Sequence, residues 1–74
     1  MEYRFGYITK YEYGWTHPQL IEIPAENDAD ALEKANQQIG RMKEHAPSHV
    51  QGYEISHIDR IEQREITTRI YSKE

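Results

Sequence analysis

Aromatic residues recur at every second position near the N-terminus, and this pattern constrains the fold more than any other feature of the chain. Side chains alternate between the two faces of an extended strand, so a period of two predicts rings on one side of a β-ribbon. Six of the eight aromatic residues follow it: Tyr3, Phe5, Tyr7, Tyr11, Tyr13 and Trp15. The even positions are typical of a solvated face, since they include Glu2, Arg4, Lys10 and Glu12.

An unbroken strand through all six rings would span on the order of 40 Å, which is longer than most strands in globular domains. We therefore expect the strand to bend, and Gly6 and Gly14 are the candidate positions. Residues 14–18 predict a hairpin loop, and Gln19 to Ile23 predict the returning strand, which Pro24 ends.

An amphipathic helix follows the predicted hairpin. Asn27 is a favourable N-cap residue, and Asp30 supplies a carboxylate near the capping-box position. The helix should end near Glu44 or His45, because Pro47 cannot continue it. An apolar stripe at spacings of three and four defines its buried face: Leu32, Ala35, Ile39 and Met42.

The last third of the chain is β-branched and favours two further strands. Tyr53, Ile55 and His57 alternate, and Ile58 then breaks the alternation, which suggests a β-bulge near His57. The polar stretch 62–65 predicts a turn, and Ile66 to Tyr71 predicts the final strand. A helix through the isoleucines of this region fits less well, because they spread too far around a helical wheel. The sequence therefore predicts one α+β domain over residues 1–74, in the order β-β-α-β-β, with one helix on an antiparallel sheet.

Size and composition limit the functions to consider. A chain of 74 residues without cysteine has a small core and no disulfide, so a homodimer and a monomer are equally compatible with its sequence. The net charge of −4 makes nucleic acid an unlikely partner, since phosphates attract basic surfaces. No segment has the length and hydrophobicity of a membrane helix, and the N-terminus lacks a signal-peptide pattern, so we expect a cytoplasmic protein.

Three rings at the end of the predicted hairpin are candidates for a binding surface. The apolar stripe of the helix is too modest to cover six large rings, so we expect Tyr11, Tyr13 and Trp15 to project beyond it. Tyrosine and tryptophan are enriched at the energetic centres of protein interfaces. These three residues therefore predict a contact with a protein partner.

Acidic residues are concentrated around the predicted start of the helix. No lysine or arginine occurs between Glu12 and Lys34, whereas five acids do: Glu22, Glu26, Asp28, Asp30 and Glu33. A solvated helix N-terminus explains such a cluster. The alternative is an acidic patch that guides a partner with a basic surface. An alternative function is inhibition of a host defence enzyme or a nucleic-acid-binding enzyme. Small acidic inhibitors of this kind are encoded by phages and other mobile elements, and such a patch would mimic nucleic acid.

Other functional patterns are weak or absent. The stretch from Arg4 to Ile8 shares residue types with the RNP1 motif of RNA-recognition domains, but Arg4 replaces a glycine and Lys10 an aromatic residue. An RNA-binding sheet thus stays a secondary hypothesis. His45 and His49 are spaced as helical metal ligands, but Pro47 interrupts that helix. We find no catalytic constellation and no phosphate-binding loop, and we expect a non-catalytic protein without metal or cofactor.

Overall fold

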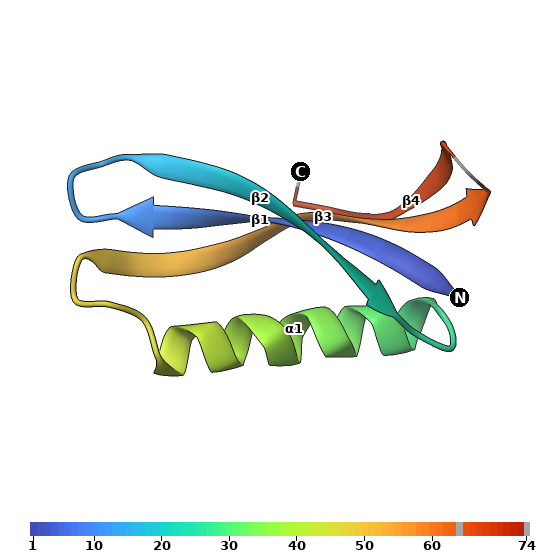
Figure 1. Cartoon of the computed structure of the whole chain (residues 1–74), viewed down its shortest axis with the longest axis horizontal. Coiled ribbons are helices and arrows are strands. Elements are labelled where there is room, and N and C mark those ends of the chain that lie inside the picture. Colours follow the sequence, from blue (N-terminus) through green and yellow to red (C-terminus); the bar gives the residue numbers. More distant parts are fainter. Residues whose placement is uncertain (64, 74) are drawn as a thin grey trace.

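The computed structural model describes residues 1–63 and 65–73, and it has the predicted α+β architecture (Figure 1). Four strands form one antiparallel sheet, and one helix packs against it. The elements in chain order are β1 (Glu2–Tyr11), β2 (Thr16–Pro24), α1 (Asp28–Glu44), β3 (Val50–Gln63) and β4 (Ile66–Ser72). The order β-β-α-β-β is confirmed.

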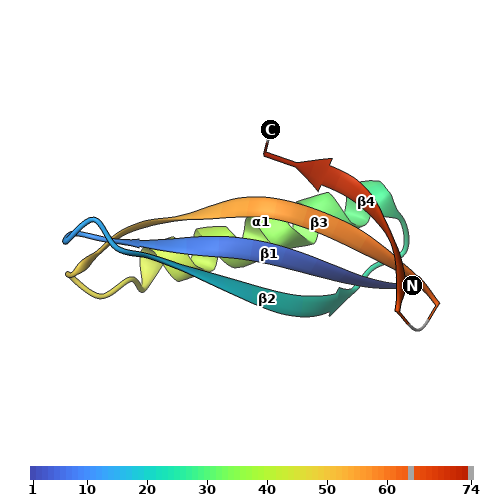
Figure 2. The same cartoon turned by 90° about the horizontal axis from the view of Figure 1, so that it is seen from above.

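The strand order, which the sequence left open, is β2-β1-β3-β4. The first strand lies inside the sheet, and hairpins join β1 to β2 and β3 to β4. The helix connects β2 to β3 and passes behind the sheet (Figure 2). The aromatic first strand is therefore paired on both sides and covered by the helix on one face.

The helix begins and ends where its capping residues predict. The Asn27 side chain accepts a hydrogen bond from the Asp30 backbone N–H at 2.8 Å, and the helix runs from Asp28 to Glu44. The Asp30 carboxylate in turn accepts from the Glu26 backbone N–H at 3.0 Å. These reciprocal bonds satisfy two N–H groups that would otherwise have no partner at the helix start.

The core lies between α1 and the odd-numbered face of β1. Tyr3, Phe5 and Tyr7 are buried there, and Ile58 of β3 lies beside them. The helix meets these large rings with small residues, chiefly Ala31 and Ala35. Small side chains allow the helix backbone to lie close to the rings, which gives dense packing despite the modest apolar stripe.

The prediction that six rings share one face of a strand is wrong beyond Tyr11. The strand ends at Tyr11, and the chain turns before Thr16, so Tyr13 and Trp15 lie in the turn. The predicted loop at residues 14–18 is therefore too late, and β2 includes Pro18. The sheet tolerates this proline because β2 is an edge strand.

The predicted irregularity near His57 is confirmed. Gly6 pairs with His57 and Tyr7 pairs with Ile55, so Ser56 is an additional residue in β3. Such a bulge returns Ile58 to the buried face. The turn predicted at residues 62–65 begins too early, because Glu62 and Gln63 still belong to β3. Of the two residues between β3 and β4, residue 64 lies outside the described residues.

Candidate functional site

The β1–β2 turn is a compact backbone structure that fixes the positions of two exposed rings. Tyr11 N–H donates to the Trp15 carbonyl at 2.9 Å, and Gly14 N–H donates to the Tyr11 carbonyl at 3.0 Å. Gly14 has a positive φ of 85°, which a residue with a Cβ adopts only with strain. A three-residue loop with glycine in this conformation is a common hairpin connection. The turn is therefore encoded by Gly14.

Tyr13 and Trp15 project into solvent from this turn. Their exposed fractions are 76% and 75%, so the expectation that these two rings extend beyond the helix is met. Tyr11 is half-buried, and its ring stacks on His49 with centroids 5.8 Å apart and planes within 5°. Glu12 N–H also donates to the His49 carbonyl at 3.0 Å, which joins the turn to the segment before β3.

The rings surround an open hollow of about 520 Å³. Its wall consists of Tyr11, Tyr13, Trp15, Thr16, His17 and Gln19. The last three were not predicted as site residues. They line the hollow because β2 pairs with β1 in a register that places His17 opposite Thr9 and Gln19 opposite Tyr7. That register follows from a turn that ends before Thr16. The loop expected at residues 14–18 would have left Thr16, His17 and Pro18 outside the strand.

One wall of the hollow is held by a core residue, because Gln19 is hydrogen-bonded to the buried Tyr7. The Tyr7 hydroxyl donates a hydrogen bond to Gln19 Oε1, and the Tyr7 ring contacts Tyr53 edge-on at 6.3 Å between centroids. Burial raises the pKa of Tyr7, so its hydroxyl stays protonated as the donor at neutral pH. The buried tyrosine thereby fixes one wall of the hollow.

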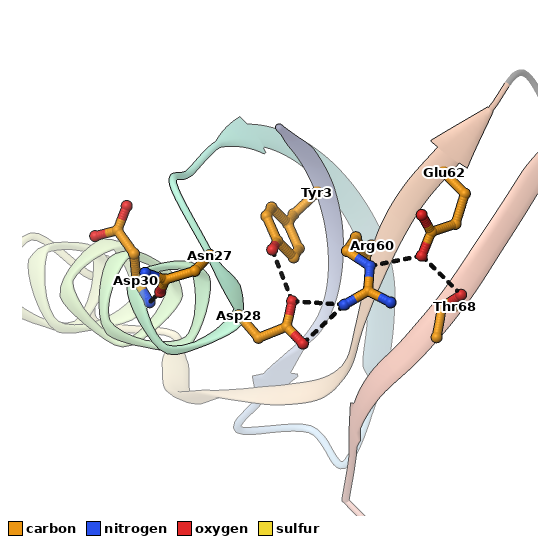
Figure 3. Close-up of polar contacts among 7 residues, drawn as sticks. All are labelled: Tyr3, Asn27, Asp28, Asp30, Arg60, Glu62 and Thr68. Atoms are coloured by element: carbon orange, nitrogen blue, oxygen red, sulfur yellow. Dashed lines mark hydrogen bonds and ion pairs between the residues drawn. The ribbon is translucent and has the colours of Figure 1, made fainter.

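At the other end of the molecule, Asp28 belongs to a partly buried polar network (Figure 3). Its carboxylate accepts from the Tyr3 hydroxyl at 2.7 Å and from Arg60 Nη1 at 2.9 and 3.1 Å. The hydrogen bond from Tyr3, together with Arg60, holds the pKa of Asp28 below its usual value. Arg60 Nε also donates to Glu62 at 2.6 Å. The charge of Asp28 is thus compensated within the chain.

The other helix acids divide into capping and exposed residues. Asp30 accepts from the Glu26 backbone and lies 3.3 Å from Lys34 Nζ, and the backbone hydrogen bond lowers its pKa. Glu26 and Glu33 are exposed, and Glu33 accepts a 3.4 Å bond from Gln37. Capping and solvation therefore account for these acids at the start of α1.

The structure separates Glu22 from the other predicted acids, which lie together around the start of α1. Ile21 and Ile23 pack against the core, so Glu22 between them points to the opposite face of the sheet, where Arg4 lies 3.5 Å away. The acids at the start of α1 lie at the end of the molecule opposite to the β1–β2 turn (Figure 1). The longest dimension is 38 Å, several times the distance over which salt screens charge.

The face of the sheet away from α1 carries ion pairs that the sequence did not reveal. Glu54 binds Lys10 at 2.7 Å and Lys73 at 2.6 Å, and these two hydrogen bonds lower the pKa of Glu54 to about 2. Asp59 binds Arg69 at 2.9 Å, which lowers the pKa of Asp59. Each pair joins segments that are distant in the sequence, so only the strand register could identify it.

The described residues contain no group of three or more histidine, cysteine or acidic side chains arranged to hold a metal ion. His49 stacks on Tyr11, and His57 Nδ1 lies 3.0 Å from Ser56 Oγ. Across the same residues, no helix has the length and hydrophobicity required to cross a bilayer.

Comparison with known proteins adds no relative. No protein-family model matches the chain, and neither curated proteins nor solved structures match it.

Proposed function

We propose that this chain is a non-catalytic binding module that holds a protein partner with the aromatic turn, defined as Tyr11, Tyr13 and Trp15. The observation that carries the proposal is the exposure of Tyr13 and Trp15 on a turn that the backbone holds in one conformation. Exposed aromatic clusters of this kind usually mark a contact surface.

The physical basis is burial of the two rings without a large ordering cost. Tyrosine and tryptophan combine a large apolar surface with a polar tip, and they have only two side-chain torsions to fix. The hydrogen-bonded turn has already fixed their backbone. Truncation of such a residue at the centre of an interface costs about 2 kcal/mol or more of binding free energy.

A protein partner is favoured over RNA because of where the rings lie. Tyr3, Phe5 and Tyr7 are buried beneath α1, so the sheet cannot offer them to bases. The open face of the sheet instead carries the paired charges of Glu54 and Asp59. The exposed rings left for stacking are those of the aromatic turn, beside Glu12, and Tyr71 of β4. They belong to a chain of net charge −4, which does not attract phosphates.

The acidic residues are not included in this contact. Asp28 is paired with Arg60, Glu22 lies on the other face of the sheet, and the remaining acids are at the far end of the molecule. A mobile-element inhibitor that mimics nucleic acid would require those acids to face its target. If the chain inhibits a host enzyme, the aromatic turn would bind that enzyme directly through its rings, without mimicry of nucleic acid by the acids.

The test compares proteins captured from the source organism by wild type, Tyr13→Ala, Trp15→Ala and Leu20→Ala. Leu20 is the matched control, since it is 61% exposed but lies on the ion-paired face of the sheet. We expect Leu20→Ala to retain the partner and each aromatic variant to lose it by at least about tenfold, with an unchanged melting temperature. Retention by both aromatic variants would refute the proposal.

The same contact can be followed directly, because Trp15 is the only tryptophan. Its emission should shift to shorter wavelength when the purified partner is added, since an exposed indole then becomes buried. An unchanged spectrum at saturating partner would place the contact elsewhere.

A further inference from the structure

The hollow at the aromatic turn combines exposed rings and hydrogen-bonding side chains in one wall. Tyr13 and Trp15 are exposed there, and the half-buried Tyr11 lines the same space. Three polar side chains complete the wall: Thr16, His17 and Gln19. The volume of about 520 Å³ is within the usual range of small-ligand sites. The hollow therefore has room for one large side chain of the protein partner.

The rings give this hollow an attraction for positive charge. The face of an aromatic ring carries a negative partial charge, so it attracts a cation that lies within about 6 Å of the ring centre. Tryptophan is the most effective ring in this respect, and two tyrosines accompany Trp15 in the wall. His49 stacks on the Tyr11 ring with planes within 5° and thereby holds that ring in one orientation. Several rings around an open space are the arrangement with which proteins bind cationic groups.

The charges of the turn also favour a cation. Glu12 is the only side chain among residues 11–19 that carries a full charge when histidine is neutral. None of the six wall residues is a lysine or an arginine. Lys10, which precedes the turn, is bound to Glu54 at 2.7 Å, so its charge is compensated within the chain. The turn thus presents a negative charge to a partner and complements a positive one.

The polar part of the wall requires a ligand that donates hydrogen bonds. Gln19 Oε1 accepts from the Tyr7 hydroxyl, and an amide oxygen has a second lone pair that can accept from a ligand. The Thr16 hydroxyl is a further acceptor in the wall. A purely apolar side chain would take these groups out of water without giving them a partner, which is unfavourable. Arginine combines five N–H donors with an apolar stem that packs on rings.

We propose that the aromatic turn binds an arginine side chain of its protein partner, with the guanidinium between the rings and its N–H groups directed towards the polar wall. The inference rests on the function proposed above and names the group that the turn recognises. Arginine is favoured over lysine because the planar guanidinium stacks on aromatic faces and is more weakly hydrated than an ammonium group. The turn lies at one end of the elongated molecule, so an arginine on the partner's surface can reach it without rearrangement of the sheet or the helix (Figure 1).

The first test uses the full chain and requires no partner. NMR follows the Trp15 indole N–H while arginine, blocked as its acetyl methylamide, is added at constant ionic strength. Citrulline blocked in the same way is the matched ligand, because it has nearly the same shape but no charge. We expect a saturable shift, and an affinity for arginine at least about fivefold higher than for citrulline, the factor that a cation–π contact supplies. Equal affinities would overturn the proposal, as would a higher affinity for blocked lysine.

Two substitutions at Trp15 separate the charge distribution of the ring from its apolar area. Trp15→Phe keeps an aromatic face, and Trp15→Leu keeps only an apolar side chain; both retain the backbone hydrogen bonds of the turn. The affinity for arginine, followed through the Tyr13 ring, should fall about two- to threefold in Trp15→Phe and about fivefold or more in Trp15→Leu. Leu20→Ala is the control and should bind arginine as the wild type does. An unchanged affinity in Trp15→Leu would contradict the proposal.

The same pair of variants keeps this inference separate from the function on which it rests. With the captured partner, Trp15→Leu should lose more binding than Trp15→Phe. If Trp15→Ala loses the partner but Trp15→Phe and Trp15→Leu retain it equally, the aromatic turn is still the contact and arginine is not its ligand. Retention of the partner by both Tyr13→Ala and Trp15→Ala would instead refute the proposed function itself.

Discussion

Gly6 lies where a side chain of β3 crosses the backbone of β1. A Cβ at this position would lie within 2.9 Å of His57 Nδ1 and of Ser56 Oγ, and closer still to His57 Cε1. The bulge at Ser56 brings both side chains over the glycine. The residue is therefore required for its small size, and its φ is not positive.

This close approach predicts that Gly6 and His57 are energetically coupled. Gly6→Ala should lower the free energy of unfolding by about 1–3 kcal/mol, the usual cost of overpacking. His57→Ala removes the ring that the new methyl group meets, so the double variant should lose less than the sum of the two single losses. Urea denaturation of the three variants measures the coupling. Additive losses would show that the ring moves aside freely.

Glu54 predicts a pH dependence of stability. Its pKa in the folded state is about 2, below the ordinary value of 4.5, because Lys10 and Lys73 bind the charged form. Because the pKa of Glu54 is lower in the folded than in the unfolded chain, its charged form stabilises the fold at pH values above the unfolded-state pKa. This contribution is lost as the pH falls from about 4.5 towards 2. We expect the melting temperature to fall over that window. Glu54→Gln should melt lower at pH 7 and lose less on acidification, and an equal loss in both proteins would exclude this cause.

At the scale of the elements, the N-terminus of α1 is stabilised by a capping hydrogen bond, whereas Gly40 destabilises its C-terminal half. Asn27→Ala removes the cap and should cost about 1 kcal/mol of unfolding free energy. Gly40→Ala should add up to about 1 kcal/mol, because a Cβ there has no atom within 4 Å and alanine favours the helix. Thermal unfolding of both variants tests the two signs. A destabilising Gly40→Ala would indicate that glycine is needed there for another reason.

The hairpin of β1 and β2 shows how one glycine sets the register of an element. With the positive φ at Gly14, the turn closes between Tyr11 and Trp15, and the pairing of Lys10 with Thr16 follows. A one-residue shift would move every side chain of β2 to the other face. Ile21 and Ile23 would then leave the core, so core burial and turn geometry specify the same register.

At the scale of the whole molecule, the aromatic turn and the helix acids lie at opposite ends of a body 38 Å long. Charges so far apart are screened at physiological salt, where the Debye length is about 8 Å. We therefore expect the Glu26→Gln, Glu33→Gln double variant to bind the partner of the aromatic turn with an unchanged association rate. Glu12→Gln, within the turn, is the control that should change it. Stopped-flow fluorescence of Trp15 measures both, and slower association of the double variant would return the acids to the interface.

Local patterns were sufficient for the helix and for the class of the fold. Asn27 and Pro47 delimited α1, and the alternation of Tyr3, Phe5 and Tyr7 identified a strand with one buried face. These predictions succeeded because capping and strand alternation depend on neighbours along the chain. The same alternation was misleading at Tyr13 and Trp15, since a period of two continues through a turn when the turn residues are also aromatic.

The sequence by itself determined the element types, their order and the residues able to form a core. Tertiary structure alone decided the strand order, the pairing of Asp28 with Arg60 and the separation of the acids from the aromatic turn. Each of these depends on which distant segments become neighbours. That choice is made by the packing of the whole chain, because strand pairs and ion pairs between distant residues leave no local periodicity to read.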